Sequence, residues 1–452
     1  MPTPEDPRGF RPTWNPALSG ALLVAIGALA ASVALTPQNL VDSDVAYYRA
    51  WGVWATANGG LSEALREYPT PAALLVWLPT FFTSSDASYR VVFVLGMAVV
   101  ALLGLLALLT LPASRATRAG VTYLVSLGAL GPIGFYRFDL VPGVLVLLAC
   151  VALLLGLRGR WSLFLAAATA VKLWPVLLWP LGLVRRATRR RELVVAGLSS
   201  VVIIGVSVAV AGWARLVSPL TWQSGRGLQV ESVAATWIYL ARLVRPSAWT
   251  AALSQANSWD FSGPGVAFTL TMASLMQLGL LVWVVLLTRR VWLGGRGDAD
   301  TITLVATSVV AGLMVTNKVF SPQYMIWLLP VASLAVGVGR GRAPRWWAPG
   351  LVGLALLTQL SYPTTYGWLY PGTADWHFLL GTVLMTGRNL GLVAFAVSVS
   401  RAAWRASAPT TPPADEGGAA LVDGGETPAG ADRTGAPDPQ RCAHRSRRTH
   451  VR

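Results

Sequence analysis

Long apolar runs without a charged residue recur along this chain, and they limit what it can fold into more than any other feature. Six of them are close in length to the ~20 residues that an α-helix needs to cross the hydrocarbon core of a bilayer. They cover residues 17–36, 91–112, 119–136, 140–157, 193–213 and 266–288. Five further runs, several of them broken by polar residues, cover 161–184, 301–316, 325–339, 346–365 and 376–400. We therefore predict an all-α fold, a polytopic membrane helix bundle with about twelve spanning or partly spanning helices.

The composition excludes an ordinary soluble domain. Hydrophobic residues make up 54% of the 452 residues and charged residues only 12%, which is far from soluble averages. The net charge of +16 comes from arginines in short clusters between apolar runs. Such clusters act as topology signals, so we do not expect nucleic-acid binding. Cys150 lies inside an apolar run and Cys442 near the C-terminus, a separation that favours neither a disulfide nor a metal site.

The arginine clusters also predict an orientation. If the N-terminus is cytoplasmic, the clusters at 115–118, 158–160, 185–191, 289–296 and 340–345 can all face the cytoplasm. The apolar stretch 71–83 must then not span. Its 13 residues, with prolines at 69, 71 and 79, predict a re-entrant or juxtamembrane helix on the outer side. The stretches 37–90 and 214–265 and the polar break at 317–324 are then external.

We divide the chain into a cytoplasmic segment (1–16), a membrane domain (17–405) and a cytoplasmic tail (406–452). The tail is rich in Pro, Ala, Gly and Asp, a composition typical of disorder. No convincing cleavage site follows the first apolar run, so we expect a retained helix and not a signal peptide. The predicted location is the plasma membrane, and the near-exclusive use of arginine fits the genome of a high-GC bacterium.

Lysine usage points to a candidate site. Of 36 basic residues only two are lysines, Lys172 and Lys318, and each lies in a polar break of an apolar run at the predicted outer surface. A compact ammonium on a flexible stem suits a phosphate group. The alternative is that both lysines extend to the lipid headgroups.

Two carboxylates follow the first apolar run directly, in the sequence Val41-Asp42-Ser43-Asp44. A carboxylate at this position can act as a general base on a hydroxyl, and a second carboxylate nearby can raise its pKa. The alternative is a helix cap or a turn.

Charged and aromatic residues also mark later outer turns. Arg137 and Asp139 lie in a short turn between two apolar runs. We expect them either to bind a substrate or to form an ion pair with each other. His377 adjoins an aromatic group that fits an interfacial belt as well as a sugar-stacking surface. That group comprises Tyr362, Tyr366, Trp368, Tyr370 and Trp376. Four further acids are more simply explained as loop surface, namely Glu63, Glu67, Asp86 and Asp260.

Taken together, these motifs resemble the polytopic GT-C glycosyltransferases, specifically the polyprenol-phosphate-mannose-dependent mannosyltransferases of glycosyltransferase family 87. The resemblance covers roughly residues 17–400. It rests on the order of five motifs, which are Asp44 with Tyr47-Tyr48, Glu67-Tyr68-Pro69-Thr70-Pro71, Arg137-Phe138-Asp139-Leu140-Val141-Pro142, Lys172-Leu173-Trp174-Pro175, and Lys318-Val319-Phe320-Ser321-Pro322-Gln323-Tyr324 followed by Trp327-Leu328-Leu329-Pro330.

The resemblance implies an inverting transfer of a sugar, most simply mannose, from a polyprenyl-phosphate donor to a hydroxyl of a glycolipid or glycan acceptor at the outer membrane face. It implies Asp44 as the catalytic base, with Asp42 as its rival. Lys172, Lys318 and Arg137 would bind the donor phosphate. Substrate binding would fall to Asp139, Tyr48, Tyr68, Gln323, Tyr324 and His377. We expect membrane lipids as partners and no cofactor, and a metal is compatible with this chemistry but not required.

One alternative of another class stays open. Broken helices with a lysine in the break also occur in transporters and in flippases of lipid-linked saccharides. Transporters place their charged sites near the membrane midplane, whereas here the polar breaks and carboxylates are predicted to meet at one face. No nucleotide-binding glycine motif follows a strand, so a Rossmann-type nucleotide-sugar site is not expected.

Overall fold

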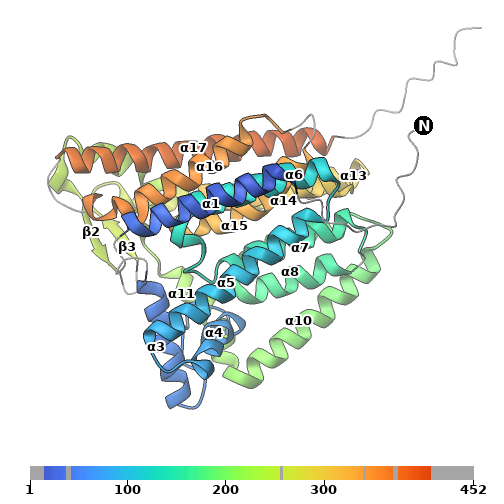
Figure 1. Ribbon diagram of the computed structural model, residues 1–452, viewed down its shortest axis with the longest axis horizontal. Coiled ribbons are helices and arrows are strands. Elements are labelled where there is room, and N and C mark those ends of the chain that lie inside the picture. The colour runs from blue at the N-terminus through green and yellow to red at the C-terminus, as the bar shows by residue number, and fades with distance from the viewer. Residues whose placement is uncertain are drawn as a thin grey trace, which may run out of the picture. The chain divides into compact units, whose positions relative to one another are not determined.

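The computed structural model of the chain describes residues 15–36, 42–157, 159–254, 258–339, 343–369 and 375–408 (Figure 1). Residues 1–14, Tyr370, Cys442 and the predicted tail from residue 409 onward lie outside the described residues. Most described residues are helical. The helices are α1 (Pro16–Leu35), α3 (Ser43–Ala57), α4 (Thr70–Trp77), α5 (Asp86–Leu109), α6 (Ala113–Leu130), α7 (Leu140–Leu154), α8 (Arg160–Val171), α9 (Trp179–Gly182), α10 (Arg189–Ala211), α11 (Trp213–Ser224), α12 (Thr236–Arg242), α13 (Val266–Leu293), α14 (Ala299–Thr316), α15 (Met325–Val338), α16 (Trp347–Gln359) and α17 (Trp376–Ala406).

Six of the described helices are long and apolar enough to cross a membrane, namely α1, α5, α10, α13, α14 and α17. Two predicted spans are shorter than expected. The run 119–136 forms helix only to Leu130, because Gly131 adopts a positive φ of 67° and Pro132 follows it. The run 140–157 forms a helix of 15 residues that ends at Leu154. A helical membrane protein is therefore supported, and the number of about twelve spans stays a prediction.

The outer helices expose many large apolar side chains, more than is usual for a protein surrounded by water. Leu198 and Val201 of α10 and Phe268 and Val285 of α13 are each more than 60% exposed. Soluble monomers rarely carry contiguous apolar surface of this extent. In lipid the same surface carries no penalty, because acyl chains are as apolar as leucine.

Helix α15 forms the centre of the bundle. All of its residues are buried, and it packs against α6, α7, α14 and α16. The contact with α7 is close because Gly143 has no side chain. A Cβ atom there would lie 2.4 Å from the carbonyl oxygen of Ile326. Small residues of this kind allow helix backbones to approach in membranes, and this approach brings the start of α7 beside the start of α15.

The two lysine-containing runs break where the sequence places their polar residues. Helix α8 ends at Val171, Lys172 is extended (φ −148°, ψ 135°), and a 3-10 turn (Trp174–Leu178) leads into α9. Likewise α14 ends at Thr316, Asn317 is extended, and a 3-10 turn (Pro322–Tyr324) leads into α15. Each break leaves a lysine on irregular backbone next to the helix bundle.

The first predicted external stretch is mostly helical. Helix α3 begins at Ser43, directly after Asp42, and was not predicted. The apolar stretch 71–83 forms α4 and a 3-10 turn (Leu78–Phe82). A short helix therefore exists where a re-entrant helix was predicted, and its depth in a bilayer stays a prediction.

The second external stretch contains a small antiparallel sheet that the all-α prediction omitted. Its strands are β1 (Leu228–Gln229), β2 (Thr250–Leu253) and β3 (Trp259–Ser262), in the order β1-β3-β2. Asp260 pairs with Gln229 on one side and with Ala252 on the other. Strands this short give almost no alternating signal in a sequence.

The arginine clusters gather at the other end of the same helices. The guanidinium of Arg115 donates two 3.1 Å hydrogen bonds to Asp300 at the start of α14. Arg118 donates to the carbonyl of Val336 at the end of α15. These contacts place Arg115 and Arg118 at the end of the bundle opposite the polar breaks, and the side of a membrane that this end faces stays a prediction.

Candidate functional site

Two adjoining cavities lie at the end of the bundle that carries the polar breaks. The first, which we call the polar cavity, has a volume of about 240 Å³. Its lining includes Asp44, Glu67, Arg137, Lys172, Arg226, Gln229, Glu231, Gln323 and Tyr324. The second, which we call the Lys318 cavity, has a volume of about 250 Å³. Both are lined by Glu67, Tyr68, Lys172, Gln223 and Tyr324, so these residues form a common wall.

Asp44 reaches the polar cavity from the first turn of α3. Its Oδ2 lies 2.5 Å from Nε of Arg137, and the aspartate side chain is 25% exposed. Arg137 is nearly buried and also donates hydrogen bonds to the side-chain oxygens of Gln323 and Tyr362, both at 3.3 Å. The guanidinium therefore fixes the position of the Asp44 carboxylate and leaves part of it open to the cavity.

Asp139 pairs with a lysine and not with Arg137. Its side chain is fully buried at the start of α7, and its Oδ1 accepts 2.8 Å hydrogen bonds from Lys172 Nζ and Trp327 Nε1. The sequence alternative, an ion pair between Arg137 and Asp139, is therefore wrong. Each residue of that turn instead pairs with a partner from a distant segment.

The Lys172 ammonium sits in an aromatic box. Its Nζ lies 4.8 to 5.8 Å from four ring centroids, those of Tyr68, Phe138, Tyr324 and Trp327. Aromatic faces attract a cation, so the box helps to hold the Lys172 ammonium beside Asp139. It is the one cation that lines both cavities, among the residues that the structure describes.

Glu67 is part of the site although the sequence favoured a loop-surface role for it. Its Oε1 accepts a 2.8 Å hydrogen bond from the hydroxyl of Tyr47. Burial and the Glu67 charge raise the pKa of Tyr47, so that hydroxyl remains a donor at neutral pH. Tyr68, whose pKa burial also raises, packs edge to face on Phe138.

The second lysine lines only the Lys318 cavity. Burial, and then the charge of Arg226, lower the pKa of Lys318. The later part of its motif, Ser321 to Tyr324, lines the polar cavity. Gln323 accepts a 2.6 Å hydrogen bond from Ser321, and Tyr324 stacks on Trp327 with centroids 3.7 Å apart.

Four of the predicted site residues line neither cavity, namely Asp42, Tyr48, Asp139 and His377. Asp42 forms an ion pair with Arg90. Tyr48 is fully buried against Phe138. His377 is exposed and stacks on the neighbouring indole of Trp376. Asp139 also lies behind the cavity wall and acts there through Lys172.

Sequence reasoning missed one wall of the polar cavity. Arg226, Gln229 and Glu231 come from the stretch around β1. Tyr362, from the turn after α16, lines the same cavity and was named only within the aromatic group. Glu231 is the notable case, because its side chain is buried and burial raises its pKa to about 7. An isolated acid within a 50-residue loop gives no sequence signal of this kind.

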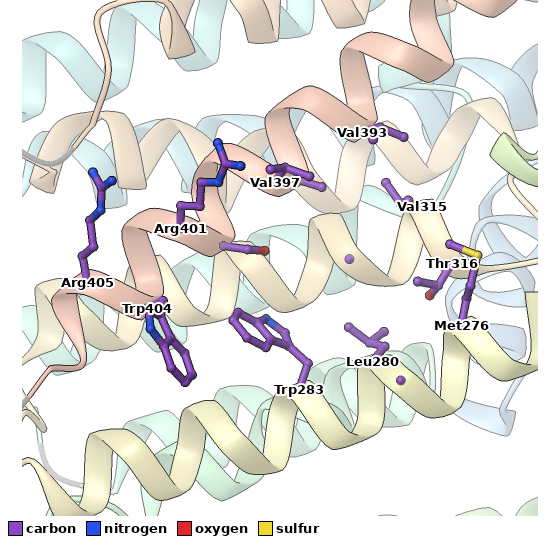
Figure 2. A pocket seen from close by; sticks show the side chains of 14 residues that line it. Met276, Leu280, Trp283, Val315, Thr316, Val393, Val397, Arg401, Trp404 and Arg405 are labelled. Atoms are coloured by element: carbon purple, nitrogen blue, oxygen red, sulfur yellow. The ribbon is translucent and has the colours of Figure 1, made fainter.

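A third cavity has a different character. It is a groove of about 640 Å³ between α13, α14 and α17, walled by apolar side chains such as Leu280 and Val397 (Figure 2). Trp283 and Trp404 stack at 5.4 Å in it. Its charged residues are arginines at the arginine-rich end, and it contains none of the predicted site residues. A surface of this kind is suited to acyl chains and offers no group for acid–base chemistry.

Among the described residues, no three of His, Cys, Asp and Glu lie close enough together to hold a metal ion. No model of a known protein family matches this chain, and no curated protein matches it.

Proposed function

We propose that this chain is a membrane glycosyltransferase of the GT-C type, similar to glycosyltransferase family 87. It would transfer a sugar, with mannose as the first candidate, from a polyprenyl phosphate to a hydroxyl of a glycolipid or glycan at the outer face of the plasma membrane. The observation that carries the proposal is that the Asp44 carboxylate and the partly buried Lys172 line a single cavity. A second cavity with Lys318 adjoins it through a common wall.

We assign stabilisation of the departing phosphate to the lysines and acceptance of the acceptor proton to Asp44. Lys172 and Lys318 are the cations of the Lys318 cavity, whose remaining wall combines apolar and aromatic residues with three amides and the carboxylate of Glu67. A lipid phosphate fits this combination, because the lysines stabilise the negative charge that develops as it departs. Asp44 lies in the polar cavity on the other side of the common wall, where an acceptor hydroxyl would reach it.

The proposed step is a single displacement. The acceptor oxygen attacks the anomeric carbon while its proton passes to the Asp44 carboxylate. The bond between that carbon and the phosphate oxygen breaks, and its electron pair stays on the phosphate. The configuration at the anomeric carbon inverts. Arg137 acts as a positioning residue that holds Asp44, and its predicted contact with the donor phosphate stays a prediction.

The alternative is a transporter or flippase of a lipid-linked saccharide. The distribution of charge favours the enzyme, because the lysines and Asp44 gather at one end of the helices and not in the middle of α14 or α15. Transporters hold their substrate near the midplane, where both sides of the membrane can reach it in turn.

A reconstitution experiment separates the two. The purified protein in liposomes receives polyprenyl-phosphate [³H]mannose and an extract of membrane acceptors, and transfer is measured as label in the acceptor fraction. A second assay measures movement of the labelled donor between leaflets. Label in the acceptor supports the proposal. Movement of the donor without transfer would support the flippase.

The lysines provide a more specific arm of the test. Lys318→Ala should raise the KM for the lipid donor about tenfold and leave the acceptor KM unchanged, because a charge-assisted hydrogen bond to the phosphate is lost. Arg90→Ala, which removes a cation that lines neither cavity, is the matched control. Equal effects of Lys318→Ala on donor and acceptor would contradict the phosphate role.

A further inference from the structure

Three residues that line the polar cavity each carry a buried side-chain polar atom without a hydrogen-bond partner among the described residues. The atoms are Nε of Arg226, Oε1 of Gln229 and Oε2 of Glu231. Leaving such an atom unpaired in a buried site costs about 1–3 kcal/mol. Of the twenty such atoms among the described residues, these three belong to residues that line one cavity, where a ligand can supply the missing partner.

This wall is rigid and is built from several elements. The backbone N–H of Gln229 donates a 3.1 Å hydrogen bond to the carbonyl of Lys318. Arg388 of α17 donates to the backbone carbonyl of Glu231, and Asn389 donates to the carbonyl of Ser232 and to the hydroxyl of Thr236. The backbone at Glu231 is therefore anchored to α17.

The wall has the hydrogen-bonding pattern of a binding site for hydroxyl groups. Arg226 offers a donor and Gln229 an acceptor, and a protonated Glu231 offers both. Trp259 and Tyr366 line the same cavity and provide ring faces on which a sugar ring can pack. A phosphate would meet the acceptor oxygens of Gln229 and Glu231 unfavourably, so the ligand of this wall is neutral.

The protonation of Glu231 depends on groups from every neighbouring element. Burial raises its pKa to about 7, while a hydrogen bond with Tyr366 and then the charge of Arg388 act in the opposite direction. Asp260 of β3 raises it slightly. Burial and the charge of Glu231 raise the pKa of three nearby tyrosines, Tyr239, Tyr324 and Tyr362, so these stay neutral.

We infer that the wall formed by Arg226, Gln229 and Glu231 is the subsite that binds the neutral, hydroxyl-rich sugar ring of the acceptor. The inference rests on the proposed function and deepens it, because it names the chemical class of the group presented to Asp44. A ring held by this wall lies in the same cavity as the Asp44 carboxylate, and the lipid phosphate is held separately by the lysines.

Steady-state kinetics with the reconstituted protein test the inference. Glu231→Ala should raise the acceptor KM about tenfold, because a hydrogen bond inside a buried site is lost, and should change the donor KM less than twofold. Glu231→Gln should restore most of the acceptor affinity at pH 8. The acceptor KM of the wild type should rise above pH 7 as Glu231 loses its proton, whereas that of Glu231→Gln should stay level. Glu63→Gln, which alters an exposed acid paired with Arg66, is the control.

A binding measurement separates failure of this inference from failure of the proposed function. Saturation-transfer NMR with methyl α-mannoside needs no turnover. Binding should persist in Asp44→Asn and disappear in Glu231→Ala. If wild-type protein binds the glycoside but transfers no sugar, the subsite stands and the proposed function fails. If transfer occurs and Glu231→Ala leaves the acceptor KM, its pH profile and glycoside binding unchanged, the inference is overturned.

Discussion

Replacing Lys172 should separate what the lysine does for stability from what it does for the reaction. The ammonium lies 2.8 Å from Oδ1 of a fully buried Asp139. At that distance, and with an effective dielectric constant of about 20, the attraction between the two charges is about 6 kcal/mol. The desolvation of both groups offsets much of it. Removing one partner, however, leaves the other charge unpaired, which costs about 3–5 kcal/mol.

We therefore expect Lys172→Met to unfold at markedly lower temperature or denaturant concentration than the wild type. The Oδ2 atom of Asp139 has no hydrogen-bond partner among the described residues, so the unpaired carboxylate has little to compensate it. In the double variant Lys172→Met/Asp139→Asn the amide oxygen can still accept from Trp327, and stability should return to within about 1 kcal/mol of the wild type.

Sugar transfer should behave differently from stability. Lys172 lines both cavities, so transfer should stay low in the double variant although the fold is restored. The assay combines unfolding in detergent, followed by tryptophan fluorescence, with transfer in liposomes. A Lys172→Met variant as stable as the wild type would refute the electrostatic reasoning, and a double variant with full transfer would remove Lys172 from the site.

Three further predictions concern packing, pH and topology. Gly143→Ala should lower the free energy of unfolding by about 1–3 kcal/mol, because the new Cβ atom would overlap the α15 backbone. Gly96→Ala, whose Cβ atom would meet nothing within 4 Å, should leave stability unchanged. The same unfolding midpoint for both variants would refute this. Because the pKa of Glu231 is higher in the folded protein than in the unfolded chain, its protonated form stabilises the folded state. This stabilisation is complete below pH 4.5, the ordinary pKa of the carboxyl, and is lost as the pH rises through about 7. The unfolding temperature should therefore fall more between pH 5 and pH 8 in the wild type than in Glu231→Gln. The same dependence of unfolding temperature on pH in both proteins would contradict this role of Glu231. Cysteines introduced at Ser43 and Ser321, which both line the polar cavity, should react with an impermeant reagent added outside intact cells, and protection of either would contradict the outer-face site.

The apolar runs predict the helices well because spanning a bilayer requires length and hydrophobicity, and both are local properties of a sequence. The boundaries are less predictable. Helix α6 begins at Ala113 and includes Arg115 and Arg118 because these arginines find partners on α14 and α15. The sheet around β3 could not be predicted, since its four residues are held by pairing with two strands from other parts of the stretch.

The sequence predicted the site residues whose type is rare in this chain, but not the ion pairs that join distant segments. Lys172 and Lys318 were apparent because they are the two lysines of an arginine-rich chain. The partners of Asp139 and Arg137 could not be read from the sequence, because they are Lys172 and Asp44, which lie in distant segments of the chain. Glu231 carries a buried carboxyl only because α17 anchors its backbone, and nothing in its local sequence indicates this.

The most direct test of the proposed mechanism compares two neighbouring aspartates in the reconstituted transfer assay. Asp44 lines the polar cavity, whereas Asp42 pairs with Arg90 and lines neither cavity. General-base catalysis contributes about 10²–10⁴-fold to a rate. Asp44→Asn should therefore reduce kcat for sugar transfer at least about a hundredfold with donor binding retained, and Asp42→Asn should stay within about threefold of the wild type. Unchanged transfer by Asp44→Asn, or loss of transfer in Asp42→Asn alone, would contradict the assignment of Asp44 as the base.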